Sequence, residues 1–274
     1  MNTTTATPEL RALALHALQL TDATQKVAAI QAIGLSTANI NAEIIRVEPA
    51  SNLPGRPALP ELISPLLVPR RKMGTPEGRL ALAHSIAHIE FNAMNLALDA
   101  IWRFANMPHA YYLDWLTVAR EESQHFALLR AYLQGKGADY GSFPAHNGLW
   151  EMVEATRHDV LTRMALVPRL LEARGLDATP QVSAKFAQFG DTAMCAILEL
   201  ILREEIGHVA IGNHWFAWCC KERGVEPVAT FRRLALEHNA PKLRPPFNLA
   251  ARRAAGFTEV ELSALQELGA ALSA

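Results

Sequence analysis

The chain has 274 residues, half of them hydrophobic, so it can build a sizeable core without disulfides. Lysines and arginines number 26 against 27 acids, and this balance gives no general support for nucleic acid or an anionic membrane as partner. There is no run of eighteen apolar residues, and the chain starts without the basic and apolar regions of a signal peptide. We therefore expect a cytoplasmic protein that does not enter a membrane.

The first 75 residues predict a helical start and then a proline-rich segment that wraps the rest of the chain. Apolar residues recur at helical spacing over residues 8–34. Seven prolines between Pro49 and Pro76 exclude a long helix or a central strand there. Six apolar residues of this segment are available to pack, namely Leu59, Leu62, Ile63, Leu66, Leu67 and Val68.

Two long helices are expected next. The first begins with Thr75 as the N-cap and Pro76 in the first turn, and it continues to about residue 106. The second covers about 109–134 and stops at a pair of glycines, Gly135 and Gly137.

A third helix is expected over about 148–174, kinked at Pro168 and ended by Gly175. A fourth covers about 191–222. Residues 180–190 predict a short separate helix between them, and the alternative is a fourth helix that runs unbroken from Pro180.

The chain is expected to end in two further helices, near 226–239 and 258–272, around a polar segment rich in proline. We therefore predict an all-α protein in three parts, which are residues 1–75, a four-helix bundle over 76–222, and an extension over 223–274.

A repeated motif provides the strongest functional signal. Arg120–His125 reads Arg-Glu-Glu-Ser-Gln-His, and Arg203–His208 reads Arg-Glu-Glu-Ile-Gly-His. Each copy holds Glu-x-x-His, and residues three apart on a helix lie about one turn from each other on the same side. Two such helices, each with one more glutamate from a neighbouring helix, are the ligand pattern of a dinuclear carboxylate site.

The two additional glutamates can be sought by their height in an antiparallel helix pair. With helices of about 25 to 30 residues, positions at equal height are roughly thirty residues apart. Glu90 precedes Glu122 by 32 residues, and Glu172 precedes Glu205 by 33. If the fourth helix is unbroken from Pro180, the alternatives to Glu172 are Glu151 and Glu154. The predicted ligands are thus Glu90, Glu122, His125, Glu172, Glu205 and His208.

The first glutamate of each doubled pair has a different predicted role. Glu121 and Glu204 are turned from the ligands by about 100°. Metal-bound imidazoles usually donate their second N–H to a carboxylate or carbonyl group. Glu121 is therefore expected to orient His208, and Glu204 to orient His125. The alternative is that both glutamates pair with the preceding arginines or with water.

Four segments resemble an uncharacterised bacterial ferritin-like family, a domain of unknown function grouped by fold with the tRNA-hydroxylating diiron monooxygenases. They are His84–Glu90, Arg120–Phe126, Glu172–Asp177 and Arg203–His208. The resemblance covers about residues 10–250. It implies a ferritin-like four-helix bundle with the six ligands named above, including Glu172 rather than Glu151.

Carboxylate and imidazole ligands suit iron or manganese, so we expect two iron ions, with Mn/Fe or manganese as alternatives, and no organic cofactor. The predicted activity is that of a diiron oxygenase or oxidase that uses O₂ and an external electron donor. The alternatives are an iron-handling ferroxidase and a metal-stabilised interaction protein without turnover. The expected protein is a monomer or small homo-oligomer, and its substrate is a small molecule or a phosphate-rich compound. A tRNA substrate fits the resemblance but is not supported by the net charge.

Overall fold

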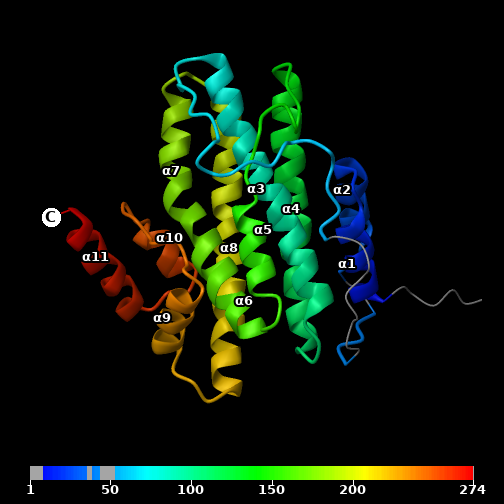
Figure 1. Cartoon of the computed structure of the whole chain (residues 1–274), viewed down its shortest axis with the longest axis vertical. Coiled ribbons are helices and arrows are strands. Elements are labelled where there is room, and N and C mark those ends of the chain that lie inside the picture. The colour runs from blue at the N-terminus through cyan, green and yellow to red at the C-terminus, as the bar shows by residue number, and fades with distance from the viewer. Residues whose placement is uncertain (1–8, 36–38, 44–52, 274) are drawn as a thin grey trace, which may run out of the picture. The chain divides into compact units, whose positions relative to one another are not determined.

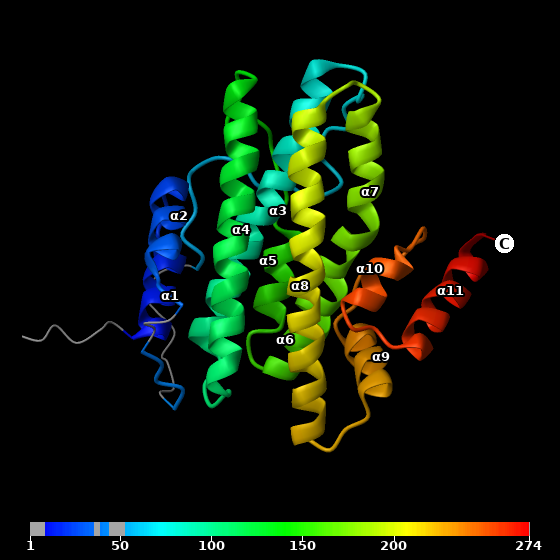
Figure 2. The ribbon, with the colours of Figure 1, turned by 180° about the vertical axis from the view of Figure 1, so that it is seen from behind.

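A computed structural model of the chain describes residues 9–35, 39–43 and 53–273. Figures 1 and 2 show its ribbon from opposite sides. Within the described residues the chain is helical, and apart from two isolated bridge pairs it contains no strand. The expected all-α class is therefore confirmed. The helices fall into two compact units, Met1–Gly148 and Leu149–Ala274.

The first unit is built on a hairpin of two long helices, α3 (Pro76–Arg103) and α4 (His109–Gly135), which confirms both predicted helices. Thr75 caps α3, because its hydroxyl accepts a hydrogen bond from the backbone N–H of Gly78 at 3.0 Å. Pro76 occupies the first turn, where its missing N–H sacrifices no helical hydrogen bond. The short connection between the helices brings the middle of α3 against the middle of α4.

Two shorter helices, α1 (Leu10–Gln19) and α2 (Ala23–Ala32), pack on this hairpin. The helical pattern expected over 8–34 is divided because Asp22 accepts a hydrogen bond from the N–H of Gln25 at 2.8 Å and starts a new helix.

Three cations fasten α1 and α2 to the hairpin. Arg11 is fully buried and donates to the carbonyl of Trp102 at 2.8 Å. Lys26, also buried, donates to Asn95 Oδ1 at 2.6 Å. Arg120, the first residue of the first motif, donates to the carbonyls of Gln31 and Ile33 at the end of α2, at 2.7 and 2.8 Å. The arginine of that motif therefore holds α2 in place.

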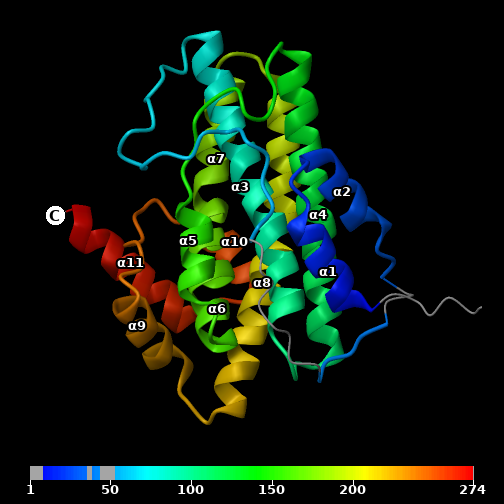
Figure 3. The same ribbon diagram turned by 45° about the vertical axis from the view of Figure 1, so that its right-hand side comes forward.

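The proline-rich segment before α3 contains no helix over its described residues, 53–75, as expected. It is tied to the unit at Ile63, whose N–H donates to the carbonyl of Ala145 at 2.9 Å. Beyond that point it extends as an open loop, which Figure 3 shows. Of the six apolar residues expected to pack, four are exposed, and Leu66 is 94% exposed. The four exposed residues are Leu59, Leu62, Leu66 and Leu67.

The second unit contains one long irregular helix followed by one long regular helix. Its elements are α5 (Gly148–Ala155), α6 (Val160–Leu166), the π-helix η1 (Val167–Glu172), α7 (Ala173–Ala187) and α8 (Thr192–Glu222). The helices α6, η1 and α7 follow one another without a gap and form one continuous irregular helix. All three pack against α8. Figures 1 and 2 both show α7 beside α8.

The third helix differs from its predicted form, a single helix over 148–174 with a kink at Pro168. It is interrupted after α5, because Asp159 accepts hydrogen bonds from the N–H groups of Leu161 and Thr162 and starts α6. At Pro168 the chain forms a π-helical turn instead of a simple kink.

The predicted end of this helix at Gly175, and the separate helix over 180–190, are wrong. Gly175 continues the helix into α7, whereas Gly190 adopts the left-handed conformation (φ 68°) that ends it. The expected break before residue 191 is present, so α8 does not run unbroken from Pro180.

Three short helices follow, α9 (Pro227–Glu237), α10 (Leu249–Ala254) and α11 (Glu259–Ser273). The first and last were expected. The intervening α10 was not, and it begins where Asn248 accepts a hydrogen bond from the N–H of Ala251 at 3.2 Å. Residues from α7, α8, α10 and α11 share one apolar cluster, made of Ala173, Leu176, Val209, Ala251, Ala255, Phe257 and Leu262.

No helix among the described residues is both long enough and apolar enough to cross a membrane. The expected division into parts at residues 75/76 and 222/223, and the cytoplasmic location, stay predictions.

Candidate metal centre

The first unit brings three predicted ligands together at the middle of the α3–α4 hairpin. Glu90 lies on α3, and Glu122 and His125 lie one turn apart on α4. Their ligand atoms lie within 4.8 Å of one another. His125 Nδ1 is 3.4 Å from Glu90 Oε2 and 3.4 Å from Glu122 Oε2. Glu122 and His125 are 0% exposed and Glu90 is 3% exposed.

The electrostatics of this triad favour positive charge close to its carboxylates. Burial raises the pKa of Glu90, and the nearby Glu122 carboxylate raises it further, to about 8. Burial by itself lowers the pKa of His125. The hydrogen bonds and charges of Glu122 and Glu90 outweigh that effect and raise this pKa to about 11. Both shifts favour the protonated forms of Glu90 and His125, and a bound metal ion would take the place of these protons.

The second unit repeats the Glu-x-x-His arrangement on α8. Glu205 Oε1 lies 3.7 Å from His208 Nδ1, one turn further along the helix. Glu205 is 8% exposed and His208 is 1% exposed. The third predicted ligand of this half, Glu172, is the last residue of η1 and is also buried.

Burial separates Glu172 from the two competing glutamates. Glu151 is exposed on α5. Glu154 pairs with Arg157 at 3.4 Å, and both side chains are exposed by more than a third. A ligand of a buried site must itself be buried, and of these three glutamates Glu172 meets this condition, so its burial favours it as the ligand.

The structure leaves the predicted orienting role of Glu121 and Glu204 as a prediction. Glu204 makes an ion pair with Arg203 at 3.3 Å, which was the alternative role considered for it. Glu121 is half-buried.

A histidine and tyrosine network flanks Glu90 on α3. Tyr140 Oη lies 2.8 Å from His88 Nδ1, and the N–H of Gly141 donates to His84 Nε2 at 2.9 Å. Both histidines therefore fix the loop after α4. Burial lowers the pKa of each to about 4, so they are neutral near pH 7. No signal in the sequence identifies Tyr140 as a partner of these histidines.

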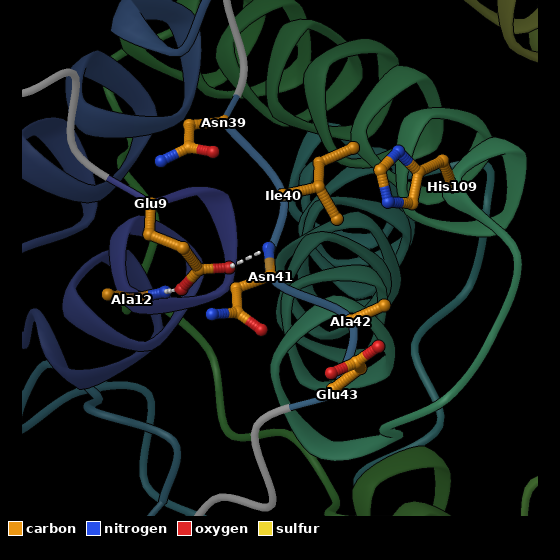
Figure 4. A pocket seen from close by; sticks show the side chains of 8 residues that line it. All are labelled: Glu9, Ala12, Asn39, Ile40, Asn41, Ala42, Glu43 and His109. Carbon is orange, nitrogen blue, oxygen red and sulfur yellow. Dashed lines mark hydrogen bonds between the residues drawn. The ribbon is translucent and has the colours of Figure 1, made fainter.

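A polar cavity of about 470 Å³ lies elsewhere in the first unit, between α1 and the start of α4. Figure 4 shows Glu9 turned towards Ala12 and Asn41, whose N–H groups donate to it at 2.9 and 3.2 Å. His109, on the cavity wall, precedes Glu122 by 13 residues of α4, which corresponds to about 20 Å along the helix. The cavity is therefore separate from the triad, and Glu9 serves there as the helix cap of α1.

A family model described as "Protein of unknown function (DUF455)" matches residues 6–263 of the chain. The chain is also similar to a protein of Haemophilus influenzae described as an uncharacterized protein. The two are 48% identical over 229 residues, which cover 81% of this chain and 80% of the other. No solved structure matches the chain.

Proposed function

Because the chain belongs to the DUF455 family of proteins of unknown function, we infer its activity from the site, and we propose a diiron oxidoreductase that activates O₂. The reaction would be the hydroxylation or oxidation of a small-molecule or phosphate-rich substrate. The proposal further includes a ferritin-like four-helix bundle in which the two Glu-Glu-His triads bind one pair of iron ions.

The observation that carries the proposal is the buried triad of Glu90, Glu122 and His125. Two carboxylates and one imidazole form a hard O/N donor set of the kind that iron and manganese prefer. The second unit supplies the same set of residue types in Glu172, Glu205 and His208. Two equal half-sites, each with a suitable donor set, account for a pair of metal ions better than for a single one.

The orphaned polar atoms of the triads also fit a bound cation. Among the described residues, Glu205 Oε2 is buried without a hydrogen-bond partner. Glu90 Oε2 is buried as well, and His125 Nδ1 lies 3.4 Å from it, at the long end of the range for a hydrogen bond. An unsatisfied buried carboxylate oxygen is costly, by about 1–3 kcal/mol or more. A coordinated metal ion would satisfy both oxygens, so the donor set and its burial agree with metal binding.

Two ferrous ions bound by this donor set would supply electrons for the reduction of O₂, and an external donor would restore them. The chain itself contributes charge and exclusion of water. Its glutamates balance the positive charge of the ions. Phe91 and Phe126, each next in sequence to a ligand, pack edge to face with centroids 5.5 Å apart, so apolar side chains adjoin the triad.

Oxygen uptake as a function of iron loading tests this proposal. The full-length protein is loaded anaerobically with increasing Fe(II) and then mixed with O₂. We expect uptake to saturate at two irons per chain and to resume after chemical reduction. The variant Glu205→Ala should abolish this saturation point, whereas Glu199→Ala should retain it, because Glu199 is exposed on the same helix.

Two other outcomes would overturn the proposal. An iron-handling protein would continue to oxidise Fe(II) far beyond two irons per chain. A protein that uses its metal for structure alone would bind iron and take up no O₂.

A further inference from the structure

The π-helical turn η1 has an identifiable cause in the sequence. Pro168 lacks the N–H that an α-helix would direct to the carbonyl four residues earlier, and its ring crowds that carbonyl. The chain responds with a wider turn that contains one extra residue. Such turns are rare and frequently occur at functional sites. This one ends at Glu172, the predicted ligand with the least regular backbone.

Helix α8 contacts this turn at a glycine, Gly212. Gly212 has no side chain, and a Cβ atom there would lie 2.5 Å from Pro168 Cβ and 2.7 Å from Pro168 Cγ. The proline ring therefore packs directly on the backbone of α8. Gly212 follows His208 by four residues, so the contact with Pro168 lies about one turn beyond that predicted ligand. Any larger residue at 212 would push η1 away from α8.

Arg169 fastens the turn at the same point. It is 5% exposed, and its Nη1 donates to Asn213 Oδ1 at 2.6 Å, while Asn213 donates to the carbonyl of Ala255 at 2.7 Å. The Arg169 guanidinium also makes an ion pair with Glu261 of α11. A buried cation is costly unless it is paired, so Glu261 is needed to keep Arg169 in place.

Three aromatic rings enclose the Arg169 guanidinium on its remaining sides. Its Cζ lies 4.9 Å from the ring centroid of Phe216, 5.2 Å from that of Phe231 and 4.8 Å from that of Phe257. These rings belong to α8, to α9 and to the segment before α11. The C-terminal helices are thereby fixed to η1 through one side chain.

A second arginine holds the chain on the other side of Glu172. Arg252 of α10 is fully buried and binds Asp177 through Nε at 3.0 Å and Nη2 at 2.6 Å. It also donates to the carbonyl of Ala173, the residue after Glu172, at 3.2 Å. The backbone around Glu172 is therefore fixed at Arg169 before it and at Ala173 and Asp177 after it.

We propose that Arg169 is a positioning residue that sets the direction of the Glu172 carboxylate relative to Glu205 and His208. Arg169 acts together with its partners Asn213 and Glu261, and we call these three residues the clamp. This inference rests on the proposed function, in which Glu172 is a metal ligand. If the clamp is lost, the contact of Pro168 with Gly212 alone holds the π-turn on α8, and the end of the turn that carries Glu172 is less constrained. A shift there would turn Glu172 away from the direction in which it binds metal. The C-terminal helices would then serve the metal centre without contributing a ligand.

A double-mutant cycle between the clamp and Glu172 tests the inference. The probe is Co(II) alone, bound to the full-length chain, and the readouts are the binding isotherm and the visible absorption of the bound ion. Arg169→Gln should weaken the binding of one of the two ions by about tenfold, in the range for residues that support a metal ligand. Its absorption spectrum should change as it does in Glu172→Ala. In the Glu172→Ala background, Arg169→Gln should cause no further loss.

A milder variant and a matched control keep the test decisive. If Arg169→Gln does not fold, Glu261→Gln replaces it in the cycle, because it weakens the same ion pair while the guanidinium of Arg169 and its bond to Asn213 are retained. Arg253→Gln is the control, since Arg253 pairs with Glu259 in the same C-terminal region with both side chains exposed. We expect it to bind Co(II) as the wild type does.

The outcomes separate this inference from the proposed function. Binding of two Co(II) ions with additive losses in the cycle, or with no effect of the clamp variants, would overturn the positioning role and leave the proposed function intact. A wild-type chain that binds no metal would overturn both.

Discussion

His125 on α4 lies with its Nδ1 3.4 Å from Glu90 Oε2 on α3, and both side chains are buried. Burying a carboxylate and an imidazole between two helices costs free energy, because each group loses its contact with water. Their close approach, with Glu122 as the third member, is the arrangement from which the metal-binding account of this protein follows.

The histidines should be needed for metal stoichiometry. Wild-type protein reconstituted anaerobically with Fe(II) should bind two ions per chain. His125→Ala and His208→Ala should each lose at least one of them, because each removes the nitrogen donor of its triad. Elemental analysis after desalting measures the ratio. His214→Ala, which alters an exposed histidine of α8, should keep both ions. Full retention of metal in the double variant His125→Ala/His208→Ala would refute the ligand assignment.

The glutamate of η1 should be distinguishable from the glutamates of α5 by the same method. Glu172→Ala should impair loading of the second ion, since it removes a buried carboxylate from the second triad. Glu151→Ala and Glu154→Ala should leave loading unchanged, because these side chains lie at the surface. A loss of metal in either α5 variant, with normal loading of Glu172→Ala, would show that the third ligand of this triad was assigned wrongly.

Lys26 should make the stability of the protein depend on pH. Burial, aided by the charge of Arg56, lowers the pKa of Lys26 from 10.5 to about 7. Between these values the unfolded chain binds more protons at this group than the folded chain does. The contribution of Lys26 to the free energy of unfolding therefore rises as the pH rises through this window, by up to about 1.4 kcal/mol per pH unit.

Urea denaturation between pH 7 and 10 measures this effect. Lys26→Met should remove this contribution, so its free energy of unfolding should rise less, or fall more, with pH than that of the wild type, whatever its effect on stability at a single pH through the lost bond to Asn95. Lys185→Met is the matched control, because Lys185 is exposed on α7 and its removal should leave the slope unchanged. Equal slopes for wild type and Lys26→Met would contradict the role assigned to burial.

Local rules predicted the start of α3 and the approach of the first two motif ligands. Thr75 and Pro76 form a cap whose chemistry is contained in four residues, so no distant contact could change it. Glu122 and His125 lie near each other because three residues on a helix return to the same side. The prediction that Glu90 lies beside Glu122 and His125 required one further quantity, the approximate length of the two helices.

The features that escaped prediction depend on contacts distant in sequence. Gly175 reads as a helix end, but the chain continues because the next residues pack on α8 and α10, and Gly190 ends the helix instead. Pro168 was expected to kink its helix, but the groove at Gly212 accepts its ring and permits a π-turn. Arg169 resembles a surface arginine in the sequence, because its three aromatic partners lie 47 to 88 residues further along the chain.

Mössbauer spectroscopy of ⁵⁷Fe-loaded, air-oxidised protein tests the central claim most directly, because it distinguishes a coupled iron pair from separate ions. The account predicts that Glu90, Glu122, His125, Glu172, Glu205 and His208 bind two ferric ions close enough to couple. The low-temperature spectrum in a weak field should then be a quadrupole doublet without magnetic splitting, with two irons per chain. A magnetically split spectrum of isolated high-spin ferric ions, or the absence of bound iron, would contradict it.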